Sequence, residues 1–215
     1  MADRYAVMVD LDGRPVLVVG GGAVATRKVL GLLAAGAEVH VVAPELGAPL
    51  AELAGAGTIR WHPTAYLALG RPRDHRPWWF VVAATDDGAV NDRVVADAAR
   101  AGVWANHAGR ADGGGASVPA SRTTGRATVA VATGGAHPAA ARWLLDRAVD
   151  ALDPASLVAL ELVEEVRTLD GRDGRPGRRP DWQCAVDSGT LDLIREGRTA
   201  EAKERLQACL SSSSD

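Results

Sequence analysis

Short continuous runs of apolar residues alternate with segments of helical spacing along the first half of the chain. The first run, Val16–Val19, holds four aliphatic residues in a row, which is typical of a parallel strand covered on both faces. A short strand is also expected within Tyr5–Gly13. Four further runs are expected to be strands: Glu38–Ala43, Thr58–His62, Trp78–Ala84 and Val103–Asn106. The alternation predicts an α/β fold with a parallel sheet.

A glycine-rich turn follows the first run without interruption. Gly20, Gly22 and Ala25 fill the small-residue positions of G-x-G-x-x-G/A, which allow a tight turn, close approach to a pyrophosphate and close helix packing. A helix beginning near Ala23 would direct free N–H groups at that pyrophosphate. An ordinary glycine turn is the alternative, but a second strand completes a β-α-β unit of about thirty residues. We therefore expect a Rossmann-type dinucleotide site formed by Gly20, Gly22, Ala23, Val24 and Ala25.

Polar residues follow the other predicted strands, at the edge where a doubly wound sheet binds its ligand. After the second strand, Pro44 and Glu45 reach the place of the acidic residue that accepts ribose hydroxyls. No arginine stands directly after this strand, which favours NAD over NADP. After the fourth strand, Thr85 and Asp86 are expected beside the cofactor. Asp86 or Asp87 is alternatively the cap of the next helix, and the two roles are compatible.

The fifth predicted strand brings Asn106 and His107 to the same edge. Asn106 is expected to contact the cofactor. His107 is a candidate for handling a proton, because the ordinary pKa of a histidine, about 6.5, suits that work. A histidine that is merely hydrogen-bonded at a strand end is the alternative for His107.

The second half of the chain changes from alternating elements to helices. A short strand is predicted at Thr128–Thr133, and a helix opens at Pro138. One strand and one helix cannot bury two faces alone, so we expect pairing with a second copy of the chain. Three further helices are predicted: Leu157–Leu169, Trp182–Ile194 and Thr199–Leu210.

Composition narrows the possible functions. The 215 residues are 47% hydrophobic, which supports a substantial core, and a net charge of -3 gives no electrostatic case for nucleic acid or an anionic membrane. Without an apolar leader or a membrane-spanning run, a soluble cytoplasmic protein is expected. Two cysteines are too few for a disulfide framework or a zinc site, and the five histidines show no i, i+3 or i, i+4 pairing. No metal site is therefore expected.

Several motifs follow one another in a fixed order along the chain. Their residues are Gly20–Ala25 with Arg27 and Lys28, Val41–Glu45, Ala83–Asp87, Val90, Asn91, Asn106, Pro119, Ala120, Ala130–Gly135 and Pro138. The order of these motifs resembles that of the precorrin-2 dehydrogenase family, which also forms the N-terminal module of siroheme synthase. The resemblance implies an NAD-binding domain over residues 1–112, a dimerisation segment over 113–152 and a helical domain over 153–215. It also implies a homodimer that oxidises the tetrapyrrole precorrin-2 to sirohydrochlorin with NAD; some family members also insert ferrous iron.

One departure from the family pattern concerns the reacting centre. The resemblance implies a central aspartate three residues after Asn106, but that position is Gly109. Three explanations stay open. The glycine-rich loop Ala108–Ala116 shifts in register so that Asp112 takes the place, His107 handles the proton instead, or hydride transfer needs no dedicated base and only chelation has been lost. Loss of chelatase activity is favoured over loss of dehydrogenase activity.

A substrate with many carboxylates calls for cations and hydrogen-bond donors. Thr133 stands where family members often carry serine, although it is alternatively the cap of the next helix. The substrate-binding candidates are Arg110, Ser117, Thr133, Gly134 and Gly135. The resemblance thus implies an NAD-dependent precorrin-2 dehydrogenase of siroheme or cobalamin biosynthesis. The alternatives are a bifunctional enzyme that also inserts Fe2+ or Co2+ into sirohydrochlorin, and an altered paralogue that only binds a tetrapyrrole.

Overall fold

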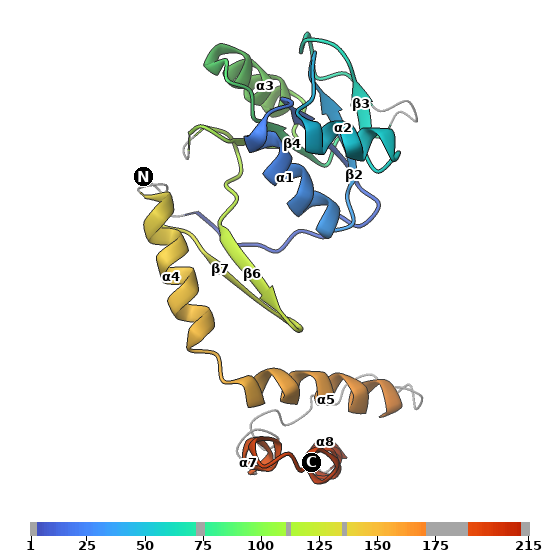
Figure 1. Ribbon diagram of the computed structural model, residues 1–215, viewed down its shortest axis with the longest axis vertical. Coiled ribbons are helices and arrows are strands. Elements are labelled where there is room, and N and C mark those ends of the chain that lie inside the picture. Colours follow the sequence, from blue (N-terminus) through green and yellow to red (C-terminus); the bar gives the residue numbers. More distant parts are fainter. Residues whose placement is uncertain (1–3, 72–75, 111–112, 135–136, 171–188, 212–215) are drawn as a thin grey trace. The chain divides into compact units, whose positions relative to one another are not determined.

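The computed structural model describes residues 4–71, 76–110, 113–134, 137–170 and 189–211 (Figure 1). The chain divides into two compact units. Unit 1 comprises Met1–Val118 and Ala132–His137, and unit 2 comprises Pro119–Val131 and Pro138–Asp215. Among the described residues, no helix is both long enough and apolar enough to cross a bilayer.

Five parallel strands form the sheet of unit 1, in the order β3-β2-β1-β4-β5. The strands are β1 (Pro15–Val19), β2 (Glu38–Val42), β3 (Arg60–His62), β4 (Phe80–Ala83) and β5 (Trp104–His107). The helices between them are α1 (Ala23–Ala34), α2 (Ala48–Gly55) and α3 (Gly88–Arg100). After β3 the chain returns to the other side of β1, so the strand order reverses between β1 and β4. This is the Rossmann-type arrangement, and it confirms the predicted fold class.

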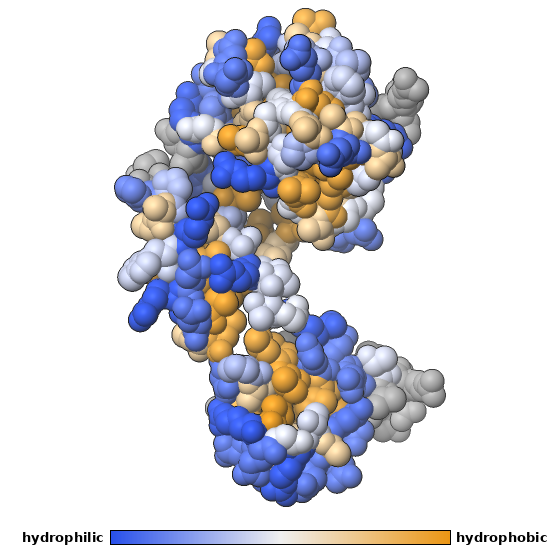
Figure 2. Space-filling view, in the orientation of Figure 1, coloured by the Kyte–Doolittle hydropathy of each residue, from blue (hydrophilic) through white to orange (hydrophobic). Residues whose placement is uncertain are grey.

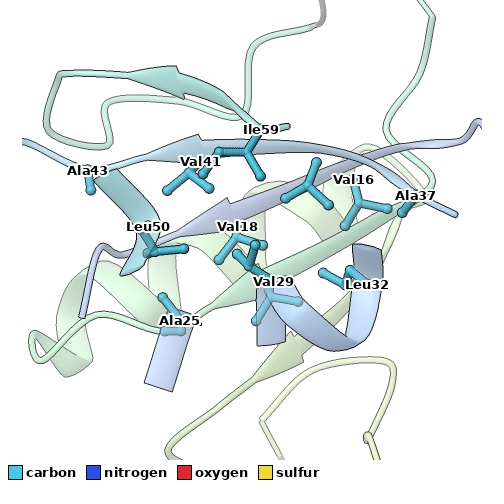
Figure 3. Packing of buried hydrophobic residues seen from close by; sticks show 13 residues of the cluster. Val16, Val18, Ala25, Val29, Leu32, Ala37, Val41, Ala43, Leu50 and Ile59 are labelled. Carbon is cyan, nitrogen blue, oxygen red and sulfur yellow. The ribbon is translucent and has the colours of Figure 1, made fainter. Parts of the chain in front are cut away.

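The core of unit 1 lies on both faces of this sheet. Every residue of β1 is buried, which explains its continuous apolar run. On one face, Val18 belongs to a cluster with Val29 of α1 and Leu50 of α2 (Figure 3). On the other face, Leu17 belongs to a second cluster with Val94 of α3. The two layers hold the carboxyl ends of β1, β4 and β5 in a fixed relation.

Unit 2 begins with an antiparallel hairpin of β6 (Ala120–Thr124) and β7 (Ala127–Val131). No residue of either strand is fully buried. Helix α4 (Pro138–Asp150) contacts both strands and buries Ala141 and Leu145. This segment therefore has only a thin core.

Three further helices complete the described part of unit 2, namely α5 (Pro154–Asp170), α7 (Thr190–Arg195) and α8 (Thr199–Ser211). They share a small core that includes Leu162 and Leu206. The visible face of α7 and α8 is mainly hydrophilic, whereas apolar residues gather over α5 (Figure 2). The helical prediction for this region is confirmed where the structure describes it; residues 182–188 of the predicted Trp182–Ile194 helix lie outside the described residues.

One strand prediction was wrong, and one strand was not predicted. The first half of Tyr5–Gly13 forms no strand, because its apolar side chains meet no neighbouring strand: Tyr5 is 90% exposed and Met8 is 78% exposed. Only the turn at Asp12 and Gly13 is present. Strand β6 was missed, because its sequence A-S-R-T-T is polar and mostly exposed and so lacks the apolar run of a covered strand.

Candidate active site

Three consecutive glycines after β1 have different surroundings. A Cβ on Gly20 would lie 2.3 Å from the carbonyl oxygen of Ala84, and its φ of 125° also excludes most side chains. A Cβ on Gly21 would lie 2.0 Å from the carbonyl oxygen of Glu45. Among the described residues, nothing lies within 4 Å of the corresponding point at Gly22. The first two glycines therefore pack the turn against the neighbouring loops, and Gly22 faces open space.

Gly21 was not among the predicted site residues. Its carbonyl oxygen accepts a hydrogen bond from the N–H of Gly47 at 2.9 Å, which ties the turn to the loop before α2. The G-x-G-x-x-G/A pattern leaves this position unspecified, so the signal that would have found it is the glycine at the middle of the G-G-G run.

Helix α1 begins directly after this turn. Gly22 is its N-cap and, having no side chain, makes no side-chain cap hydrogen bond. Ala23 and Val24 are exposed at the first turn, whereas Ala25 is buried against the sheet. The free N–H groups of a first helical turn form an anion site, and the exposed small residues leave a phosphate room to approach.

The loop after β4 is fixed by a buried asparagine. The Nδ2 of Asn91 donates to the carbonyl oxygen of Thr85 at 2.9 Å, and its Oδ1 accepts from the Thr85 N–H at 3.0 Å and from the Thr85 hydroxyl at 2.8 Å. Asp87 caps α3, since its Oδ1 accepts from the N–H groups of Ala89 and Val90. Asp86 is left exposed at the carboxyl edge of the sheet. The capping alternative thus holds for Asp87.

Asn106 presents a buried acceptor at the end of β5. Its side chain is 6% exposed, and its Nδ2 donates to the carbonyl oxygen of Ala116 at 3.3 Å. Its Oδ1 has no hydrogen-bond partner among the described residues. Pro44 and Glu45 lie exposed just after β2. The carboxyl edge therefore combines an open glycine turn with an unsatisfied oxygen.

His107 is buried beside this asparagine. Its Nδ1 accepts a hydrogen bond from the N–H of Gly109 at 3.1 Å. Its Nε2 lies 3.6 Å from Oδ1 of Asp92, a residue of α3. Arg110 also binds Asp92, with Nη2 at 3.0 Å from Oδ1. The loop after β5 therefore faces a carboxylate from α3.

The predicted substrate-binding residues other than Arg110 are more exposed than Asn106 and His107 where the structure describes them. Ser117 is exposed, Thr133 is half-buried, and Gly134 is exposed with a φ of 61°. Asp112 and Gly135 lie outside the described residues. Within the described part of the chain, no group of three or more His, Cys, Asp or Glu side chains is arranged to hold a metal ion.

A family model matches the part of the chain that contains this sheet. The NAD(P)-binding family model NAD_binding_7 matches residues 7–120, which is more than half of the chain. The chain belongs to this NAD(P)-binding family. The matched residues include the glycine turn, the loop after β4 and Asn106. The predicted NAD cofactor is thereby confirmed.

Known relatives resemble the chain along nearly its whole length. Siroheme synthase 1 of Serratia proteamaculans (strain 568) is 35% identical over 210 residues, which cover 95% of this chain and 43% of the relative. Siroheme synthase of Chromobacterium violaceum is 34% identical over 210 residues, covering 94% of this chain and 43% of the relative. The chain thus spans less than half the length of these relatives.

A solved structure is similar over almost the complete chain. The structure of SirC, a precorrin-2 dehydrogenase, aligns with a TM-score of 0.71 and 29% sequence identity, covering 96% of this chain and 98% of that one. Together with the siroheme synthases, it confirms the resemblance drawn from the sequence motifs.

Proposed function

We propose that the chain oxidises precorrin-2 to sirohydrochlorin with NAD, as a step of siroheme or cobalamin biosynthesis. The observation that carries the assignment of the cofactor site is Asn106 Oδ1, a buried acceptor without a partner among the described residues. Such an atom costs about 1–3 kcal/mol unless a ligand donor satisfies it. Amide and hydroxyl donors of a dinucleotide suit this atom. The tetrapyrrole substrate is supported by the names of the relatives, which are siroheme synthases and a precorrin-2 dehydrogenase.

The cofactor-binding residues divide by their place along the edge of the sheet. Gly20, Gly22, Ala23, Val24 and Ala25 would hold the pyrophosphate at the start of α1, where free N–H groups and the helix dipole favour negative charge. Pro44 and Glu45 would lie at the ribose, and Thr85, Asp86 and Asn106 towards the nicotinamide. When bound, NAD supplies the ring that accepts a hydride. The network between Asn91 and Thr85 would keep the loop after β4 in one conformation while the cofactor enters.

Substrate carboxylates would be held by the second group of candidates. Arg110 offers an exposed guanidinium, and Ser117 and Thr133 offer hydroxyl donors. Gly134 and Gly135 would add backbone N–H groups. These residues supply the cations and donors that an anionic macrocycle needs.

A proton must leave with the hydride, and the sequence offers Asp112 and His107 to receive it. The hydrogen bond at His107 argues against this residue as the proton acceptor. Because the Gly109 N–H can only donate, Nδ1 must present its lone pair there, and the hydrogen of the neutral ring is then on Nε2. His107 in this arrangement has no lone pair left for a substrate proton.

We propose that metal insertion has been lost. The family aspartate associated with chelation by the resemblance is replaced by Gly109. A glycine provides no carboxylate to receive the pyrrole protons that a metal ion displaces.

The proposed enzyme is a homodimer that pairs through residues 119–150. A two-stranded hairpin is marginal alone in water, and neither strand here is fully buried. Helix α4 also exposes apolar side chains, with Trp143 62% and Leu144 41% exposed. A second copy would cover these groups. Sedimentation of the wild type should give a dimer, and Trp143→Asp should shift it to a monomer; a monomeric wild type would contradict this assembly.

The activity is tested by incubating the chain with precorrin-2 and NAD and following NADH and the product spectrum. Sirohydrochlorin with Fe(II) or Co(II) forms the second assay. We expect turnover in the first and no metal insertion in the second. Metal insertion would favour the bifunctional alternative, and the absence of activity in both assays would favour a paralogue that only binds a tetrapyrrole.

The variant Asn106→Leu tests whether the cofactor binds the side-chain oxygen of Asn106. The variant should weaken NAD binding about tenfold in calorimetry, since one hydrogen bond to a buried group is lost. Its melting temperature should change little, because removal of the unsatisfied oxygen is offset by loss of the hydrogen bond from Nδ2 to the carbonyl oxygen of Ala116. Unchanged NAD affinity would show that the cofactor does not use this atom.

A further inference from the structure

A carboxylate that sequence reasoning did not select lies at the end of β5. Asp92 is on the second turn of α3, and its side chain is 53% exposed. Arg110 binds both of its oxygens, with Nη2 at 3.0 Å from Oδ1 and Nη1 donating to Oδ2 at 3.4 Å. Nε2 of His107 lies 3.6 Å from Oδ1 on a third side. An exposed carboxylate is therefore paired with Arg110, from the loop after β5, and lies close to His107 at the end of β5.

The histidine beside it presents a donor. Since Nδ1 of His107 accepts from the Gly109 N–H, the hydrogen of the neutral ring is on Nε2 and is directed to the side of Asp92. His107 itself is 6% exposed, so solvent and ligands reach Asp92 more easily than the imidazole. Of the two groups, the carboxylate has both a free lone pair and access.

We propose that Asp92 is the proton acceptor of the oxidation, with His107 and Arg110 as positioning residues; this inference rests on the proposed function. Oxidation removes two hydrogens from the tetrapyrrole. One leaves a C–H bond with its electron pair as hydride to NAD, and the other leaves as a proton. The electron pair of that second bond stays in the macrocycle as a new double bond. The Asp92 carboxylate accepts the proton and releases it to solvent.

A purely structural role predicts different behaviour. An ion pair between half-exposed groups is worth about 0–1 kcal/mol, so its loss would hardly change folding. Asp97, on the same helix, offers a control: it pairs with Arg100 of α3 at 2.8 Å and accepts a hydrogen bond from the hydroxyl of Tyr66 at 2.8 Å, and neither partner belongs to β5 or the loop after it. If Asp92 only stabilises the helix, its substitution should change turnover no more than substitution of Asp97 does.

The test compares Asp92→Asn, Asp92→Glu, Asp97→Asn and Asp112→Asn with the wild type in the precorrin-2 assay. NAD affinity is measured in parallel by calorimetry. We expect Asp92→Asn to lower kcat about 100-fold, the low end for loss of a general base, with NAD affinity unchanged. Asp92→Glu should keep at least a tenth of the wild-type kcat, because it retains a carboxylate. Asp97→Asn should leave kcat within twofold of the wild type.

Several results would overturn the inference. These are a kcat of Asp92→Asn within threefold of the wild type, an equal fall in Asp92→Asn and Asp92→Glu, or a large loss confined to Asp112→Asn. In each case a wild type that oxidises precorrin-2 leaves the proposed function standing. A wild type that binds NAD but oxidises no precorrin-2 would overturn both.

Discussion

The two units of this chain achieve order by different means. Unit 1 has a sheet covered on both faces, with β1 completely buried and apolar clusters above and below it. The hairpin and α4 of unit 2 bury only Ala141 and Leu145 among their described residues, while Trp143 stays exposed. A covered parallel sheet specifies its own fold, whereas the hairpin segment leaves apolar surface for another chain. The difference separates the part that binds the cofactor from the part proposed to assemble the dimer.

The largest effect should come from the core that distinguishes unit 1. Leu50 of α2 is fully buried in the cluster between the helices and the sheet. Leu50→Ala should therefore lower the free energy of unfolding of unit 1 by about 2–5 kcal/mol. Leu145→Ala in α4 should cost less, because fewer buried groups surround it. Leu30→Ala, at a position 51% exposed, is the matched control. Urea unfolding followed by hydrogen exchange of each unit measures the difference, and a larger loss at Leu145 would reverse the comparison.

A smaller but sharper effect is expected within the glycine turn. Gly21→Ala would place a Cβ 2.0 Å from the carbonyl oxygen of Glu45, so the backbone must move. The free energy of unfolding of unit 1 should therefore fall by about 1–3 kcal/mol. Gly22→Ala meets nothing within 4 Å among the described residues, so it should lower the free energy of unfolding by less than Gly21→Ala, through the poorer helix N-cap alone. It should nevertheless weaken NAD binding, because its methyl group enters the space proposed for the pyrophosphate. Equal stability of the two variants would show that the turn does not need this close approach.

The parts of the fold that could be predicted are those that leave a local pattern. A strand covered on both faces needs a continuous apolar run, and β1 and β4 have one. Strand β6 leaves no such pattern, because its side chains are mostly exposed. Tyr5–Gly13 has the apolar pattern without the neighbouring strand. Pattern alone says which residues suit a strand, and only the tertiary fold says whether a partner is present.

The candidate site was predictable to the same degree. The turn chemistry of Gly20 and Gly22 is local, so it is visible in the motif. The contact of Asp92 with the end of β5 and the loop after it joins segments whose approach depends on the packing of α3 on the sheet. No spacing rule connects them in the sequence.

The smallest predicted effect concerns a buried histidine pair in unit 1. His40 is 1% exposed, its Nδ1 lies 3.2 Å from Nε2 of His62, and its Nε2 lies 3.3 Å from Oε1 of Glu38. Burial lowers the pKa of His40, and the hydrogen bond with Glu38 opposes this only in part. The same burial would raise the pKa of Glu38, but hydrogen bonds from Arg76 and His40 lower it overall. The folded unit therefore favours neutral His40 beside an ionised carboxylate.

Acidification should then destabilise unit 1 before unit 2. Because the pKa of His40 is lower in the folded state, the unfolded chain binds the proton first as the pH falls. The contribution of neutral His40 to the stability of unit 1 is therefore complete above a pH of about 6.5 and decreases below it. The loss should be at most about 1.4 kcal/mol per pH unit for one proton. In unit 2, hydrogen bonds from Arg195 and Arg198 lower the pKa values of Asp153 and Glu201, so these carboxylates respond only at lower pH. Hydrogen exchange at pH 7.5 and 5.5, values set about one unit either side of that midpoint, should show weakening of unit 1 alone. His40→Leu should remove most of that dependence, and an equal response of both units would mean that the histidine pair is not its source.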